Sequence, residues 1–229
     1  MEIKKGLFVK AFLITLALLI SIYSLNLYLN SEREKYLDER MNSVVDDFEE
    51  FQALSNLMNV FGENATCLTL NSQLRLMDTK IWALGEKIEN YHLISKDYMN
   101  DPYYHQLKEK FNRQEVIYLS DLKEMKRRCG LSQLEILYFY RRAEDCPACD
   151  DQAYVLNYFN QYIDPEVAVF SFDADLNSSS VGVLQGIYNI TEYPCLVVGE
   201  RVACGLQDKN ALEIVLCTES NNTISICRK

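Results

Sequence analysis

The sequence predicts a small α/β domain with the element order β-α-β-α-β-β-α, preceded by an N-terminal transmembrane helix and an α-helical hairpin. Three observations lead to this fold class. A long uncharged apolar run lies near the N-terminus, apolar side chains recur at helical spacing through the middle of the chain, and β-rich runs alternate with amphipathic segments thereafter. We expect an anchor over residues 1–30, a coiled-coil-like helical domain over 31–130, the α/β domain over 131–218 and a disulfide-held tail over 219–229.

The membrane element is the run 11–29, which contains no charged side chain and is about as long as a bilayer-spanning helix requires. It is long for the apolar region of a cleaved signal peptide, which is the alternative, and no clear A-x-A site follows it. We therefore expect an uncleaved single-pass anchor. The basic residues that flank the run are equal in number on its two sides: Lys4, Lys5 and Lys10 before it, and Arg33, Lys35 and Arg40 after it. The positive-inside rule consequently leaves the orientation open.

The cysteines indicate the orientation, because the chain has 8 of them and structural disulfides persist in oxidising compartments. Two-residue hairpin geometry places Cys195 opposite Cys204. Cys217 and Cys227 are close enough in sequence to hold the C-terminal tail. We expect the N-terminus in the cytoplasm and the later domains outside, in a periplasm, at a cell surface or in a lumen.

Glycosylation sequons support an exterior location weakly, since such triplets also occur by chance. They make the chain a candidate glycoprotein. The four sequons begin at Asn64, Asn177, Asn189 and Asn221.

The segment between anchor and α/β domain carries apolar stripes that predict three helices, with breaks at 62–64 and 99–102. The stripe residues are Leu37, Met41, Val44, Phe48 and Phe51; Leu70, Leu74, Met77, Ile81, Leu84, Ile88 and Tyr91; and Tyr104, Leu107, Phe111, Tyr118, Leu122 and Met125. Because the second and third helices are joined by a short turn, they run antiparallel. Cys67 and Cys129 then meet at the open end and form a disulfide. Such stripes usually make a bundle core; a homo-oligomer interface, a substrate-docking surface and a stalk are the alternatives.

Two cysteines with C-x-x-C spacing, Cys146 and Cys149, follow the first β-rich run of the α/β domain. Pro147 suits the first position of a helix, which places Cys146 at the N-cap, where the helix dipole stabilises a thiolate. The spacing alone is weak evidence, since zinc sites share it. The elements expected after the motif are a helix over 152–162, a strand over 166–172, a helix over 179–190, strands over 195–198 and 201–204, and a helix over 209–217 capped by Asp208.

This order, with C-x-x-C after the first strand and Tyr193-Pro194 before the third, resembles the compact form of the thioredoxin superfamily over residues 134–217. The resemblance implies a thioredoxin-like fold in which Cys146 is the exposed attacking cysteine and Cys149 the resolving one. It also implies that Tyr193 and a cis Pro194 form the substrate-side wall.

The chain departs from thioredoxins at two places. Tyr140 stands where thioredoxins carry a buried aspartate, and Arg142 and Asp145 replace the flanking tryptophans. The Pro-Ala dipeptide between the cysteines is closer to glutaredoxins and periplasmic disulfide oxidases.

The expected function is that of a membrane-anchored extracytoplasmic thiol–disulfide oxidoreductase, of open direction, acting on protein thiols and disulfides. It needs no cofactor, but a membrane or soluble redox partner must reset the dithiol. One alternative is a non-catalytic binding or structural module in which Cys146–Cys149 is a fixed disulfide; another is a metal-handling protein with these two soft ligands. The net charge of −10 argues against nucleic acid. His92 and His105 lie outside the dithiol unit, and no metal site is expected from them.

Overall fold

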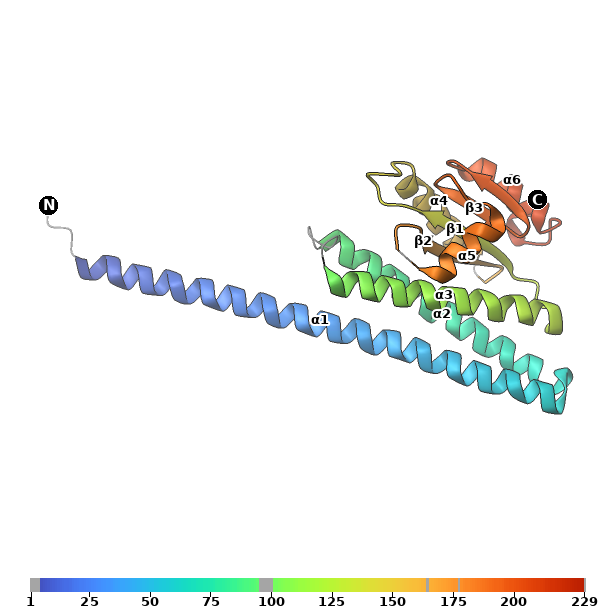
Figure 1. Ribbon diagram of the computed structural model, residues 1–229, viewed down its shortest axis with the longest axis horizontal. Helices are drawn as coiled ribbons and strands as arrows, with labels where there is room; N and C mark the ends of the chain where they lie inside the picture. Colours follow the sequence, from blue (N-terminus) through green and yellow to red (C-terminus); the bar gives the residue numbers. More distant parts are fainter. Residues whose placement is uncertain (1–4, 95–100, 164, 177, 229) are drawn as a thin grey trace. The chain divides into compact units, whose positions relative to one another are not determined.

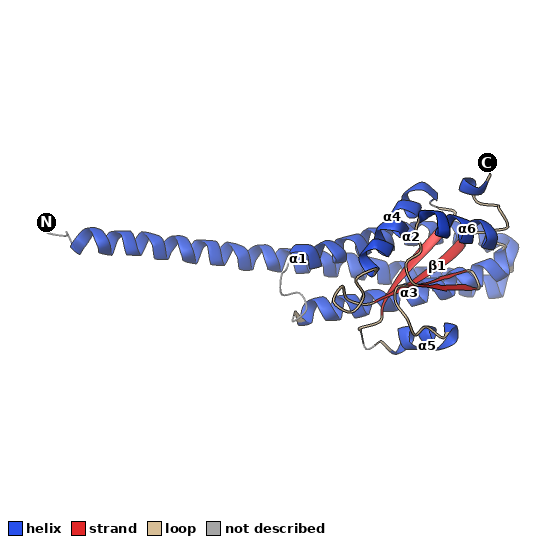
Figure 2. Ribbon diagram, turned by 90° about the horizontal axis from the view of Figure 1, so that it is seen from above, coloured by secondary structure: helices blue, strands red, loops and turns tan. Residues whose placement is uncertain are grey.

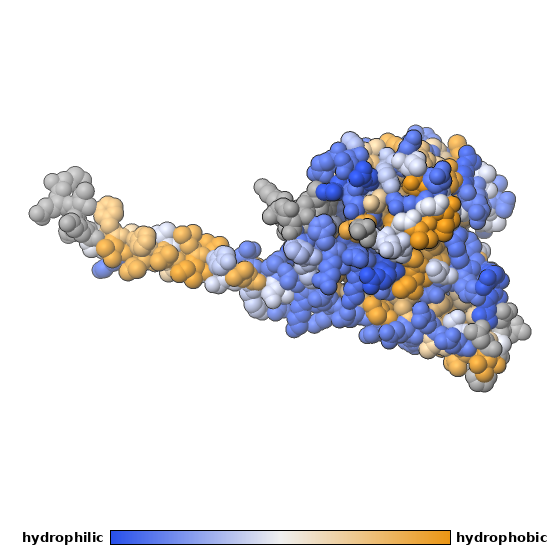
Figure 3. All heavy atoms as spheres, in the orientation of Figure 1, coloured by the Kyte–Doolittle hydropathy of each residue, from blue (hydrophilic) through white to orange (hydrophobic). Residues whose placement is uncertain are grey.

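In the computed structural model, which describes residues 5–94, 101–163, 165–176 and 178–228, the chain begins with one long helix, α1 (Lys5–Phe61) (Figure 1). An apolar stretch of α1 is long enough to cross a membrane and has a mean hydropathy of 2.1 over its most apolar window. Its side chains form an exposed apolar band (Figure 3). Gly62 ends the helix with a φ of 91° and donates its N–H to the Met58 carbonyl at 3.0 Å, as left-handed C-terminal glycines do.

The chain forms two compact units, Met1–Asn42 and Ser43–Lys229. Residue 30 lies within α1, and the helix continues from one unit into the other. The division into domains at residues 30, 130 and 218 stays a prediction.

The helical hairpin consists of α2 (Glu63–Ile94) and α3 (Pro102–Cys129), whose connection lies largely outside the described residues. Asp101 caps α3 by accepting the Tyr103 N–H at 3.0 Å, with Pro102 in the first helical position. Within Ser43–Lys229, every predicted stripe residue whose side chain is described is buried. The helices approach closely at Gly85, where an added Cβ would lie 2.9 Å from the Phe111 ring. The predicted helical hairpin is therefore confirmed.

The α/β part is a four-stranded mixed sheet in the order β2-β1-β3-β4. Strands β1 and β2 are parallel, and the other neighbours are antiparallel. The strands are β1 (Leu134–Tyr140), β2 (Val167–Asp173), β3 (Cys195–Val198) and β4 (Arg201–Cys204). The remaining elements are α4 (Cys149–Ile163), α5 (Ser179–Tyr188), α6 (Lys209–Glu219) and a short 3₁₀ helix, η2 (Ser225–Cys227). Their sequence along the chain is the predicted one, and the small mixed α/β sheet domain is confirmed.

Both faces of β1 are covered, which explains its nearly continuous apolar run. Ile136 and Tyr138 face a core shared with α4 and α6, which lie on one side of the sheet, whereas α5 lies on the other (Figure 2). On that second side Phe139 packs against Phe172 of β2, with ring centroids 5.4 Å apart. The Tyr118 ring of α3 lies 5.2 Å from the Phe170 ring, so α3 also covers this face.

The buried sides of two helices of the α/β domain are set by their contacts with the sheet. On α4 the buried stripe includes Val155, Phe159 and Ile163, and Tyr154 is 68% exposed. On α5 only Val181 is buried, and Ile187 is 66% exposed. The apolar residues of α5 are thus spread around the helix rather than gathered on one side.

The outer edge of β2 is closed by two buried side chains of α3. Glu115 accepts the Ser171 N–H at 2.7 Å, while Asn112 donates to the Ser171 carbonyl at 3.0 Å and accepts the Asp173 N–H at 3.2 Å. Asn112 also donates to Glu115 at 2.9 Å. These groups satisfy backbone donors and acceptors that a buried edge strand would otherwise leave unpaired.

Burial raises the pKa of Glu115 to about 8, although the hydrogen bonds from Ser171 and Asn112 oppose the increase. The folded protein therefore keeps a proton on Glu115 between pH 4.5 and 8, where the unfolded chain has lost it. By linkage, stability should fall as pH rises through this window, by up to about 1.4 kcal/mol for each pH unit.

We predict that Glu115→Gln abolishes this contribution, because the amide does not titrate. The difference in unfolding free energy between variant and wild type should shift in favour of the variant from pH 5 to pH 8, as measured by urea unfolding. Glu109→Gln, on the exposed side of α3, is the matched control and should leave the wild-type pH profile unchanged. An identical pH profile in wild type and Glu115→Gln would show that Glu115 is ionised in the folded protein.

Candidate functional site

Cys146 and Cys149 are joined by a disulfide, with their Cα atoms 5.4 Å apart, and follow the C-terminal end of β1. The register pairs Phe139 with Cys195, so the chain before β3 lies at the same end of the sheet. That chain is Tyr193-Pro194, whose peptide bond is cis, as the resemblance implies. The sheet therefore brings together the two motifs that the sequence singled out.

The turn before the helix is closed by two backbone hydrogen bonds to Arg142. Its carbonyl accepts the N–H of Asp145 at 3.0 Å and that of Cys146 at 2.8 Å. The Cys146 carbonyl then accepts the Cys149 N–H at 3.0 Å. Helix α4 consequently begins at Cys149 and not directly after Cys146, which corrects the predicted start. The hydrogen bond between Cys146 and Cys149 closes one turn of the 3₁₀ type, and the α-helical hydrogen bonds begin after it.

Neither cysteine is exposed: Cys146 is 3% and Cys149 2% accessible to solvent. The expectation that Cys146 is an exposed attacking cysteine is wrong for this disulfide form. The bond draws the Cys146 sulfur towards Cys149, which lies on the buried side of α4. The residues around Cys146, at 142–145 and 147, are exposed.

Tyr138 of β1 supports the start of α4, a role that the sequence did not single out. Its hydroxyl donates to the Cys149 carbonyl at 2.6 Å, which fixes the first turn of α4 on β1. Burial raises the pKa of Tyr138 well above its ordinary value, so the phenol stays protonated and able to donate. The available signal was a tyrosine, and not a phenylalanine, on the inner face of a buried strand, because a buried phenol needs a partner.

The positive charges next to the dithiol are held by Asp175. Arg141 and Arg142 donate side-chain hydrogen bonds to it at 2.7 and 3.2 Å, and the Arg142 backbone N–H donates at 2.8 Å. Burial alone would raise the pKa of Asp175, but these hydrogen bonds bring it below its ordinary value. The sequence did not single out Asp175 for this role.

Tyr193 and Pro194, for which the resemblance implies a substrate-side role, are held by contacts with neighbouring segments. Gln185 of α5 donates to the Tyr193 hydroxyl at 2.7 Å, and the Arg141 guanidinium lies 5.8 Å from the Tyr193 ring centre. Pro194 is buried, and its carbonyl accepts the Gly205 N–H at 2.8 Å. Arg141 thus links the loop before the dithiol to the loop before β3.

A cavity of about 110 Å³ lies between the helical hairpin and the dithiol loop. Its lining includes Glu89 and Lys108 from the hairpin, and Tyr140, Asp150 and Asp173 from the α/β domain. Lys108 is buried, contacts Glu89 at 3.5 Å and lies 5.4 Å from the Tyr140 ring centre. Burial would lower the pKa of Lys108, but Tyr140 and the nearby acidic groups raise it, so the ammonium stays charged.

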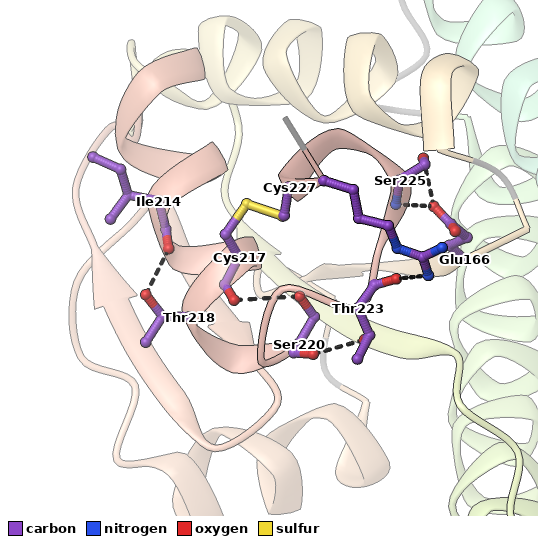
Figure 4. Close-up of a disulfide and its surroundings, with 9 residues drawn as sticks. Glu166, Ile214, Cys217, Thr218, Ser220, Thr223, Ser225 and Cys227 are labelled. Atoms are coloured by element: carbon purple, nitrogen blue, oxygen red, sulfur yellow. Dashed lines mark hydrogen bonds between the residues drawn. A yellow bond between two sulfur atoms is a disulfide. The ribbon is translucent and has the colours of Figure 1, made fainter.

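The other three disulfides are the pairs that the sequence predicts. Cys67 is bonded to Cys129 and Cys195 to Cys204, with Cα separations of 5.6 and 3.9 Å. Cys217–Cys227 holds the C-terminal tail against α6 (Figure 4). Next to it Glu166 accepts the Ser225 N–H at 2.8 Å and the Ser225 hydroxyl at 2.6 Å, which fastens η2 beside β2 (Figure 4).

The histidines do not join the dithiol by a described contact. His105 is exposed on α3, with its ring 6.1 Å from that of Tyr104, and the His92 side chain lies outside the described residues. Among the described residues, no group of three or more His, Cys, Asp or Glu side chains is arranged to hold a metal ion.

We predict that Tyr138→Phe lowers the unfolding free energy by about 1–3 kcal/mol, because the buried Cys149 carbonyl loses its donor. Urea unfolding of the oxidised protein measures this loss. Tyr154→Phe removes a hydroxyl from an exposed tyrosine and should change stability little. Equal midpoints for the two variants would mean that the Tyr138 hydroxyl contributes nothing to holding α4.

No protein-family model matches the chain, and no curated protein sequence matches it. One similar solved structure is described as "Structure of a malarial protein". The similarity covers 38% of this chain and 97% of that chain, with 18% sequence identity and a TM-score of 0.32. A likeness at this level carries no argument about function.

Proposed function

We propose that the chain is a membrane-anchored extracytoplasmic thiol–disulfide oxidoreductase whose α/β domain is of the thioredoxin type. The observation that carries the proposal is the Cys146–Cys149 disulfide after the end of β1, at the same end of the sheet as the Tyr193-Pro194 loop. A dithiol at this end of the sheet, next to a loop that can pair with a peptide, suits exchange with protein substrates.

The exchange needs only thiols and disulfides. A substrate thiolate attacks the Cys146 sulfur, which forms a mixed disulfide and releases Cys149 as a thiolate that takes up a proton. A second substrate thiolate then attacks the substrate sulfur of the mixed disulfide and releases Cys146. Two electrons pass to the site and the substrate leaves oxidised; the reverse sequence reduces a substrate. A membrane or soluble redox partner resets the pair.

Access to Cys146 requires the turn at 142–147 to open. The exposure of 142–145 and of Pro147 supports this step, since little packing has to be lost when the turn moves. Reduction itself also frees the Cys146 sulfur from the Cys149 sulfur.

An N-terminal apolar helix and multiple disulfides indicate a secreted or membrane location. The more specific proposal is an uncleaved anchor with its N-terminus in the cytoplasm and its disulfide-bonded part outside. Asn189 and Asn221, whose side chains are exposed, are then available for glycosylation.

The second candidate is a non-catalytic binding or structural module. The burial of both cysteines in the disulfide form favours it, because a buried disulfide resists exchange. The two candidates differ in how easily this one bond is reduced relative to the other three.

The deciding measurement is the reduction potential of each disulfide in the full chain, held in detergent micelles and equilibrated in glutathione buffers. Thiols are alkylated and assigned by mass spectrometry. We expect Cys146–Cys149 to titrate before the other three bonds. A value of about −120 to −180 mV would identify a disulfide donor, and one near about −270 mV a reductase. Reduction of all four bonds together would contradict the enzyme proposal.

Cysteine variants test the roles of the two sulfurs. Cys146→Ser should abolish exchange with a reduced protein substrate. Cys149→Ser, when offered a disulfide-bonded protein substrate, should accumulate a mixed disulfide: the Cys146 thiolate attacks the substrate disulfide and releases one substrate thiol, and the resolving thiol is missing. Non-reducing electrophoresis shows the adduct. The double variant Cys217→Ser/Cys227→Ser is the matched control and should retain exchange. Exchange that survives in Cys146→Ser would assign the activity to another bond.

A further inference from the structure

Four sulfur atoms meet at the open end of the helical hairpin. The Cys129 sulfur lies 4.0 Å from the Met58 sulfur and 3.8 Å from the Met125 sulfur, and it is bonded to the Cys67 sulfur. The four residues come from α1, α2 and α3, and all belong to the unit Ser43–Lys229.

Burial divides these sulfurs into an inner and an outer pair. Met58 and Met125 are each 1% exposed, so their thioethers are shielded from water. Cys67 and Cys129 are half-buried. The cysteines are therefore more open to a reductant than the methionines are.

We propose that Cys67 and Cys129, in their dithiol form, bind a copper(I) ion together with Met58 and Met125. Two thiolates and two thioethers are a soft donor set, which selects copper(I) over ions that prefer nitrogen or oxygen. The proposal does not depend on the exchange chemistry proposed for Cys146 and Cys149.

The distances from the Cys129 sulfur to the two methionine sulfurs suit ligands of a single ion. A metal–sulfur bond of about 2.3 Å, the length found in zinc thiolates, places tetrahedral ligands about 3.8 Å apart. The Cys129 sulfur lies 3.8 Å from the Met125 sulfur and 4.0 Å from the Met58 sulfur. On reduction the two cysteine sulfurs can separate to a similar distance, since their Cα atoms are 5.6 Å apart.

The redox step is balanced by an external dithiol. Its two thiols transfer two electrons and two protons to the Cys67–Cys129 disulfide, and the reductant leaves as its own disulfide. Copper(I) then displaces the two cysteine protons and keeps its oxidation state. Metal and disulfide exclude each other at this site, so oxidation of the cysteines releases the ion.

The test uses the full chain in micelles with the Cys146→Ser/Cys149→Ser background, which removes the pair proposed for disulfide exchange. The protein is reduced anaerobically with dithiothreitol, freed of reductant and titrated with copper(I) against the chromophoric chelator bathocuproine disulfonate. We expect one tightly bound copper(I) per chain, with four sulfur ligands in X-ray absorption spectra. Cys67→Ser/Cys129→Ser in the same background should lose this ion.

Methionine variants separate a ligand role from simple packing, because methionine also fills gaps in cores. Met58→Leu/Met125→Leu nearly conserves volume and should preserve the fold, yet weaken copper(I) binding about tenfold or more and reduce the sulfur count. Met77→Leu is the matched control, equally buried on α2, and should bind as the parent does. Unchanged affinity in Met58→Leu/Met125→Leu, or no copper bound by the reduced parent, would overturn the proposal.

Discussion

The hydrogen bonds from α3 to the edge of β2 are the constraint on which the rest of the unit Ser43–Lys229 depends. Asn112 and Glu115 supply the donors and acceptors that a neighbouring strand would otherwise provide. Near the C-terminal end of α3, Lys123 and Lys126 both contact the buried Glu135 of β1. Helix α3 is therefore fixed to two adjacent strands, and α2 follows because it packs on α3. The sulfur cluster and the cavity beside the dithiol both take their positions from this attachment.

Much of the fold followed from local sequence signals. The stripes of α2 and α3 are buried as their spacing predicts, because helical period alone decides which side of a hairpin faces inward. Counting outward from the turn at Gly199 paired Cys195 with Cys204 correctly, since hairpin register is fixed by the turn. Asp208 caps α6 by accepting the Ala211 N–H at 2.8 Å, as a residue of its type does before a helix. Each of these features depends on neighbours within a few residues.

The features that the sequence did not reveal depend on contacts between distant segments. Asn112 and Glu115 had the polarity of surface residues, and only the docking of α3 on β2 makes them buried partners of Ser171. The exposure of Cys146 could not be read from the motif, because it depends on how the disulfide turns the sulfur towards α4. The apolar spread of α5 likewise gave no single inner face until the sheet fixed Val181 inside.

The charges around the dithiol show why the hairpin matters to the site. Arg141 and Arg142 are the cations next to the dithiol in the sequence, and both are engaged by Asp175. The structure adds Lys108, which α3 carries into a buried position beside Tyr140. Its charge also acts on Tyr138, which holds the Cys149 carbonyl. Lys108 and Glu89 of the hairpin also line the cavity next to the dithiol loop. The hairpin therefore contributes to the surroundings of the site.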